Sequence, residues 1–135
     1  LIILKPHPSE FIETYSKIIS SYNVNNFKII QGNLFELIFV SNLVISIFST
    51  VLVDSIALKK STLRIKFEGS SPLIPYQNYN VLLECELNQL YNKINEFFNQ
   101  DEEKNILNKN RDIFLKEHYN IPNYDVDSQL KSLLD

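Results

Sequence analysis

The sequence is poor in several residues on which common kinds of site depend. Its 135 residues include 2 glycines, 1 cysteine and no methionine. Two glycines are too few for a glycine-rich phosphate loop, so a phosphate site would have to use hydroxyl groups and helix ends. The single cysteine, Cys85, excludes an internal disulfide and a cysteine-based zinc site, and favours a reducing cytosol.

Long apolar runs and an excess of positive charge are also missing. The longest apolar run, Leu43 to Phe48, is far shorter than the roughly 20 residues of a transmembrane helix. The 13 basic residues are scattered and are outnumbered by 16 acidic ones, which argues against a nucleic-acid partner. We expect a cytoplasmic protein, with peripheral attachment at the inner face of the membrane as an alternative.

The length and composition suit one folded domain. A hydrophobic fraction of 44% is typical of a chain with its own core. We expect this domain to cover residues 1–120, followed by a C-terminal tail with a short helix over residues 121–135. The chain begins inside a strand pattern, Leu1 to Leu4, without an initiator methionine. We therefore expect an N-terminally truncated piece of a longer protein; a processed or complete domain is the alternative.

Strand and helix patterns alternate along the chain. Strands are expected at residues 1–5, 27–30, 43–48, 62–67 and 81–83, and helices at 8–21, 33–40, 50–60, 87–98 and 101–118. This order predicts an α/β fold, a Rossmann-like three-layer sandwich with a mainly parallel sheet and C-terminal helices. The nearly unbroken apolar strand 43–48 is expected to be covered on both faces, and the alternating strand 62–67 to lie toward an edge of the sheet.

Local signals refine two of these helices. In the first helix, the spacing of Phe11, Tyr15, Ile18 and Tyr22 predicts the inner face, with Ile12 and Ile19 beside it. Pro8 suits the first turn of this helix. In the second, Asn33 followed three residues later by Glu36 resembles a capping box.

His7 is the first candidate site residue. It lies between Pro6 and Pro8 at the carboxyl end of a predicted strand, on a corner that the two prolines make rigid. An imidazole in this place could bind a phosphate or act as a general acid. The alternative is a turn histidine that caps a helix.

Ser49 and Thr50 are the second candidates, because the apolar period changes from that of a strand to that of a helix at these residues. They could bind a phosphate where ligands meet the carboxyl ends of parallel strands. The alternative is ordinary helix capping. Glu68, just past another strand, could bind a ribose or sugar hydroxyl or merely be solvated.

Three further residues are weaker candidates. Tyr76 and Tyr79 could stack on a base or sugar, or only pin the long loop that contains them. His118 is expected on the surface, and with His7 it makes no metal-binding spacing. We expect no metal and no cofactor.

Two short motifs carry a family resemblance. Lys5-Pro6-His7-Pro8 and Ile47-Phe48-Ser49-Thr50 resemble the HP and Ser-Ser/Ser-Thr motifs of bacterial sialyltransferases and polysialyltransferases, in the C-terminal half of a GT-B glycosyltransferase. Glycerophosphotransferases that use CDP-glycerol are similar too. The resemblance implies that His7 acts as an acid, and that it and the hydroxyls of Ser49 and Thr50 contact the nucleotide phosphate. Ser9 stands where related sialyltransferases often carry an arginine.

The resemblance implies the donor-binding part of a glycosyltransferase for bacterial surface polysaccharide or lipooligosaccharide, with a cytidine-nucleotide donor such as CMP-sialic acid. The expected donor contacts are His7, Phe48, Ser49, Thr50 and Glu68. A glycan or glycolipid acceptor would be bound through the missing N-terminal half, so this piece alone should be inactive. The alternatives are a CDP-glycerol glycerophosphotransferase, a UDP-sugar epimerase of the same fold, a non-enzymatic flavodoxin-like binding domain, and an assembly domain in which these residues are only caps.

Overall fold

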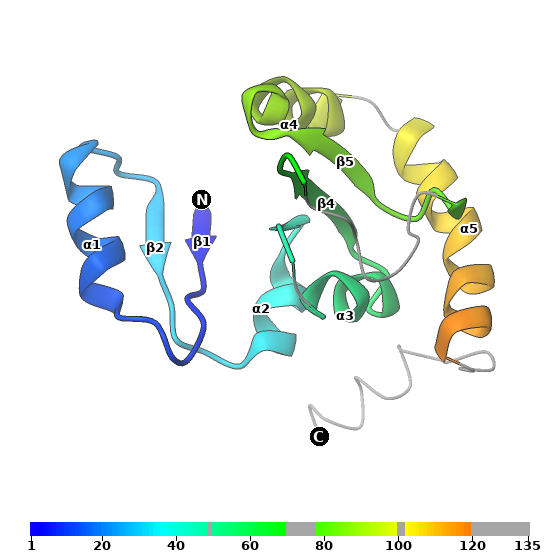
Figure 1. Cartoon of the computed structure of the whole chain (residues 1–135), viewed down its shortest axis with the longest axis horizontal. Helices are drawn as coiled ribbons and strands as arrows, with labels where there is room; N and C mark the ends of the chain where they lie inside the picture. Colours follow the sequence, from blue (N-terminus) through cyan, green and yellow to red (C-terminus); the bar gives the residue numbers. More distant parts are fainter. Residues whose placement is uncertain (49, 70–77, 100–101, 120–135) are drawn as a thin grey trace. The chain divides into compact units, whose positions relative to one another are not determined.

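The computed structural model describes residues 1–48, 50–69, 78–99 and 102–119, and within them helices follow parallel strands (Figure 1). The elements are β1 (Ile2–Leu4), α1 (Ile12–Ser21), β2 (Phe27–Ile29), α2 (Leu34–Val40), β3 (Leu43–Ser46), α3 (Val51–Ala57), β4 (Ser61–Lys66), β5 (Leu83–Glu86), the 3-10 helix η2 (Leu87–Gln89), α4 (Leu90–Asn99) and α5 (Glu102–Tyr119). The predicted α/β class is confirmed. The expected strand at 81–83 begins later, at Leu83, and the tail over residues 121–135 lies outside the described residues.

The described strands form two sheets instead of the one that the alternating pattern predicts. β1 pairs with β2, and β3, β4 and β5 form a second sheet in that order, with every pair parallel. The chain divides into two compact units, Leu1–Leu37 and Ile38–Asp135. One sheet belongs to each unit.

In the first unit, α1 connects the two parallel strands. Its half-buried side chains are Ile12, Tyr15 and Ile19, whereas Phe11 and Tyr22 are 77% and 76% exposed. The predicted buried face is therefore wrong at Phe11, Ile18 and Tyr22, and right at Tyr15 and at the two residues expected beside it, Ile12 and Ile19. Residues at positions 12, 15 and 19 also have helical spacing, so two overlapping apolar stripes were available.

The N-terminus of α1 differs from the one predicted, whereas the N-terminus of α2 matches the prediction. Pro8 lies in a turn before the helix, not in its first turn, because the N-cap of α1 is Phe11. The N-cap predicted at Asn33 is confirmed. Its Oδ1 accepts hydrogen bonds from the backbone N–H groups of Phe35 (2.9 Å) and Glu36 (3.5 Å), which are unpaired donors at a helix start.

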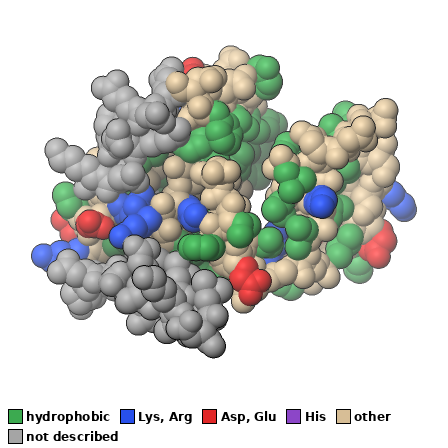
Figure 2. All heavy atoms as spheres, turned by 180° about the vertical axis from the view of Figure 1, so that it is seen from behind, with side chains coloured by type: hydrophobic (Ala, Val, Ile, Leu, Met, Phe, Trp, Pro, Cys, Tyr) green, Lys and Arg blue, Asp and Glu red, His purple; other side chains and the backbone are tan. Residues whose placement is uncertain are grey.

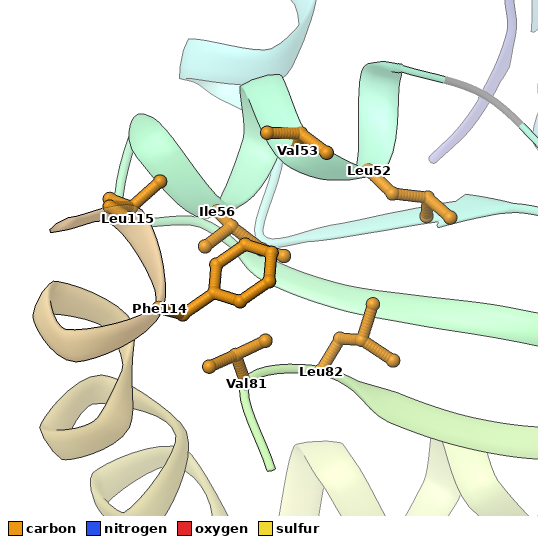
Figure 3. Close-up of a cluster of buried hydrophobic side chains, with 7 residues drawn as sticks. All are labelled: Leu52, Val53, Ile56, Val81, Leu82, Phe114 and Leu115. Atoms are coloured by element: carbon orange, nitrogen blue, oxygen red, sulfur yellow. The ribbon is translucent and has the colours of Figure 1, made fainter. Parts of the chain in front are cut away.

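The sheet of the second unit has a hydrophobic cluster on each face. On one face, Leu63, Leu83 and Cys85 pack with Phe97 of α4 and Leu107 of α5. The opposite cluster joins α3, the segment before β5 and α5, and the ring of Phe114 lies within it (Figure 3). Its members are Leu52, Val53, Ile56, Val81, Leu82, Phe114 and Leu115. Helix α5 therefore contributes to both clusters.

The positions of β3 and β4 in this sheet are the reverse of those expected. β4 is central, and its polar residues Thr62 and Arg64 are 0% and 1% exposed, so the predicted wet face is wrong. β3 lies at an edge, and its Ile45 is 40% exposed, so the prediction of a strand covered on both faces is also wrong. An alternating pattern indicates a solvent-exposed face only when its polar side chains have no partners with which they can be buried.

Large hydrophobic side chains also reach the surface of both units, as the view from behind shows (Figure 2). Examples are Phe11, Ile18 and Tyr22 in the first unit and Phe48, Tyr91 and Phe98 in the second. No helix within the described ranges is long and apolar enough to cross a membrane.

Candidate functional site

The residues after β1 form a turn that presents His7 to solvent. Pro6 is buried, whereas His7 is exposed. The backbone N–H of His7 donates to Oε2 of Glu10 (2.7 Å), and the N–H of Glu10 donates to the carbonyl oxygen of His7 (2.9 Å). These two bonds close the turn from both sides and fix the backbone that carries the imidazole.

The imidazole of His7 is oriented by Ser9. The Ser9 N–H donates to Nδ1 of His7 (3.2 Å), and the Ser9 hydroxyl lies 2.6 Å from the same nitrogen. Because a backbone N–H can only donate, Nδ1 accepts, and the neutral ring carries its proton on Nε2. Nε2–H has no partner among the described residues. It is therefore an unoccupied donor on an exposed side chain, which suits binding of an anion or donation of a proton.

The carboxylate of Glu10 supports this turn. The hydrogen bond from the His7 N–H, followed by one from the Tyr15 hydroxyl, lowers the pKa of Glu10 below its usual value of 4.5. The hydrogen bond between the Tyr15 hydroxyl and Glu10 in turn raises the pKa of Tyr15. Glu10 thus accepts its bonds as a charged carboxylate at neutral pH.

The second motif follows β3 at the edge of the other sheet. Phe48 is 58% exposed, Thr50 is exposed, and Ser49 lies outside the described residues. Thr50 is the N-cap of α3, and its carbonyl oxygen accepts bonds from the N–H groups of Val53 (2.9 Å) and Asp54 (3.0 Å). Its side chain makes no capping hydrogen bond to this helix, because its backbone is already helical. Capping by the Thr50 hydroxyl is therefore a wrong prediction.

A buried ion pair lies beside this motif. Arg64 on β4 is in register with Ser46 on β3 and with Glu84 on β5. Its Nη1 lies 2.7 Å from Oε1 of Glu84, and its Cζ lies 5.9 Å from the centre of the Phe48 ring. The alternating pattern of β4 did not predict this arrangement, because it places Arg64 on a solvent-exposed face. A signal was present, since Arg64 and Lys66 match the two-residue spacing of Glu84 and Glu86.

The remaining candidates lie elsewhere in the second unit. Glu68 is exposed in the turn after β4, whereas Tyr76 lies outside the described residues. Tyr79 pins its segment to α5, since its hydroxyl donates to Glu117 and its ring packs edge-on against Phe114 at 5.3 Å. His118 is exposed, as expected, and its ring also contacts Tyr79 at 5.1 Å.

One ionisable group in α3 is partly removed from water. Asp54 is half-buried in the first turn of this helix, and burial raises the pKa of its carboxyl. Across the described residues, no three His, Cys, Asp or Glu side chains gather closely enough to hold a metal ion.

The candidate residues are thus divided between the two units, and each follows the carboxyl end of a parallel strand: β1 for His7, β3 for Phe48 and Thr50, and β4 for Glu68. His7 belongs to the first unit, and Phe48, Thr50 and Glu68 belong to the second. Comparison of the chain with protein-family models, with curated proteins and with solved structures finds no match.

Proposed function

We propose that this chain is the donor-nucleotide-binding part of a glycosyltransferase that builds a bacterial surface glycan. The cytidine-nucleotide donor, the glycan or glycolipid acceptor and the GT-B half-fold are all parts of this proposal. The observation that carries it is the presentation of His7, a solvent-facing Nε2–H donor at the carboxyl end of β1. The resemblance of the two motifs to those of bacterial sialyltransferases supports the same function.

The proposed chemistry uses His7 as an acid. The bond between the sugar and the donor phosphate breaks, and its electron pair stays on the phosphate oxygen. His7 Nε2–H donates to that oxygen while the acceptor hydroxyl oxygen attacks the sugar carbon and gives its proton to a general base of the acceptor-binding half, which the proposal assigns outside this chain. A positioned donor stabilises charge that develops on the leaving phosphate, which is a large source of catalysis in transferases. The resemblance of the second motif supports a donor-binding role for its residues too, with the hydroxyls of Ser49 and Thr50 on phosphate and Phe48 and Glu68 on nucleoside or sugar.

A nucleotide titration tests the proposal. Isothermal calorimetry of the chain with CMP, CDP, UDP and GDP should show binding, with the cytidine nucleotides tightest. His7→Ala should weaken the binding of CMP by about tenfold, as expected for loss of one hydrogen bond to a charged phosphate.

The second histidine of the chain supplies a matched control. His118 is also exposed, but it packs on Tyr79 at the end of α5. His118→Ala should therefore leave CMP affinity unchanged. Absence of nucleotide binding, or equal losses from both substitutions, would contradict the proposed function.

A further inference from the structure

Arg64 is a buried cation on the central strand of the second unit. It is 1% exposed, and its guanidinium bonds to Glu84, whose side chain retains 14% exposure. A buried ion pair of this kind contributes little net stability compared with well-packed apolar residues, because both charges lose their hydration. Stability alone therefore does not account for this pair.

The contact between Arg64 and Phe48 indicates that role. Phe48 lies in the segment between β3 and α3, and more than half of its surface is open to solvent. One side of its ring faces the guanidinium of Arg64 at 5.9 Å, within the range of a cation–π contact. An exposed aromatic ring would otherwise move among several rotamers, so the fixed cation restricts it.

The neighbouring strands fix the cation in turn. Arg64 lies in register between Ser46, the last residue of β3, and Glu84 of β5. The ion pair with Glu84 holds the guanidinium in one orientation. The guanidinium is thereby held beside the end of β3, two residues before Phe48.

We propose that Arg64 is a positioning residue of the donor site, which it serves by holding the Phe48 ring in place through its ion pair with Glu84. This inference rests on the proposed function, because it assumes that Phe48 contacts the donor nucleotide. Arg64 itself acts only through Phe48.

The first test follows Phe48 without any ligand. The sequence contains no tryptophan, so Phe48→Trp introduces a single tryptophan, which can be excited at the red edge of its absorption without the 7 tyrosines. Adding Arg64→Met should lower the anisotropy of this tryptophan and increase its quenching by acrylamide, a neutral quencher that does not respond to the lost charge. The matched control is Arg111→Met, which removes another buried arginine, 7% exposed, from α5. Equal quenching and anisotropy with and without Arg64, in folded variants, would overturn the proposal.

Two milder variants keep the test valid if Arg64→Met does not fold. Arg64→Lys keeps the charge but loses the planar guanidinium, and Glu84→Gln keeps Arg64 but removes its charged partner. Each should increase acrylamide quenching of the Phe48→Trp reporter, in an otherwise folded chain. No increase from either variant would overturn the proposal.

The second test measures CMP affinity in the chain with its native Phe48. Arg64→Met should raise the Kd by about two- to thirtyfold, the range that corresponds to one cation–π contact. Arg64→Lys should recover part of this loss, and Arg111→Met should have no effect. Unchanged CMP binding by Arg64→Met would refute the positioning role alone. If the unmodified chain bound no CMP, the donor site itself would be refuted, while the quenching experiment would still decide whether Arg64 holds Phe48.

Discussion

Arg64 and Glu84 lie side by side on β4 and β5, with Nη1 and Oε1 2.7 Å apart where only 1% of Arg64 is exposed. The parallel register sets this distance, since it brings the two side chains to the same face of the sheet. Each charge therefore depends on the other, because neither is well hydrated.

Removal of one member of this pair should destabilise the second unit more than removal of both. We expect Glu84→Leu to lower the free energy of unfolding by about 3 kcal/mol, because Arg64 is left buried without this partner. The double variant Arg64→Met/Glu84→Leu should regain most of the lost free energy. Urea unfolding followed by circular dichroism measures both. Glu96→Gln, which breaks the exposed pair with Lys93, should cost less than about 0.5 kcal/mol. A double variant as unstable as Glu84→Leu would contradict this account.

The ring of Phe114 should be the main contribution of α5 to the cluster it shares with α3. Phe114 is 0% exposed and lies against Ile56 and Val81 (Figure 3). Phe114→Ala should cost about 3–5 kcal/mol of unfolding free energy, because the side chain leaves a cavity. Tyr91→Ala, on a residue of α4 that is 76% exposed, should cost less than about 0.5 kcal/mol. Similar losses from both substitutions in urea unfolding would show that α5 is not packed as described.

The two N-caps predicted from the sequence should respond differently to alanine. Asn33→Ala removes the bonds to the first turn of α2 and should cost about 1 kcal/mol. Thr50→Ala removes no capping bond, so we expect a loss of only about 0.3 kcal/mol. Thermal unfolding of the two variants compares them directly. If Thr50 contacts the donor, Thr50→Ala should nevertheless weaken CMP binding, whereas Asn33→Ala should not.

Acid should open the turn that presents His7. The pKa of Glu10 is lowered from 4.5, so its bonds to His7 and Tyr15 are present at higher pH and are lost as the pH falls below 4.5 through the folded-state value. Carbon-detected NMR of the Glu10 carboxyl should give a midpoint below 4.5. In Tyr15→Phe the midpoint should rise, because one of its hydrogen bonds is gone. A midpoint that Tyr15→Phe does not move would exclude the bond between these two side chains.

The thiol of Cys85 should react slowly in the folded chain. It is 3% exposed, and burial raises its pKa, so little thiolate is available to a reagent. We expect the aromatic disulfide reagent DTNB to label Cys85 much more slowly in buffer than in urea at the same pH. Phe97→Ala, which opens the cluster around Cys85, should speed the reaction in buffer. Equal rates with and without urea would show that the thiol is accessible.

Several elements follow from nearby residues alone, which explains why the sequence predicts them. The change of period near Thr50 marks the start of α3, and the side chain of Asn33 caps the first turn of α2. The polar stretch before His118 is indeed helical, in α5. Such features depend on hydrogen bonds and side-chain spacing within a few residues, and so they can be read along one segment.

The predictions that failed all required knowledge of a distant neighbour. The spacing in α1 allowed two apolar faces, and only packing selected the one with Ile12 and Ile19. Arg64 looked like a surface residue because its partner, Glu84, is far along the chain. The candidate site shows the same limit, since the sequence supplies His7 but not the Ser9 contact geometry that leaves its proton on Nε2.

The sequence by itself thus determined the alternation of helices and strands, the parallel character of the sheets and the corner at His7. Tertiary structure decided which strand is central, which face of each helix is buried and which charges are paired. The physical reason is that backbone hydrogen bonds and turn chemistry act locally, whereas burial and ion pairing depend on register between segments. In that register, Arg64 lies between Ser46 and Glu84 and beneath the ring of Phe48.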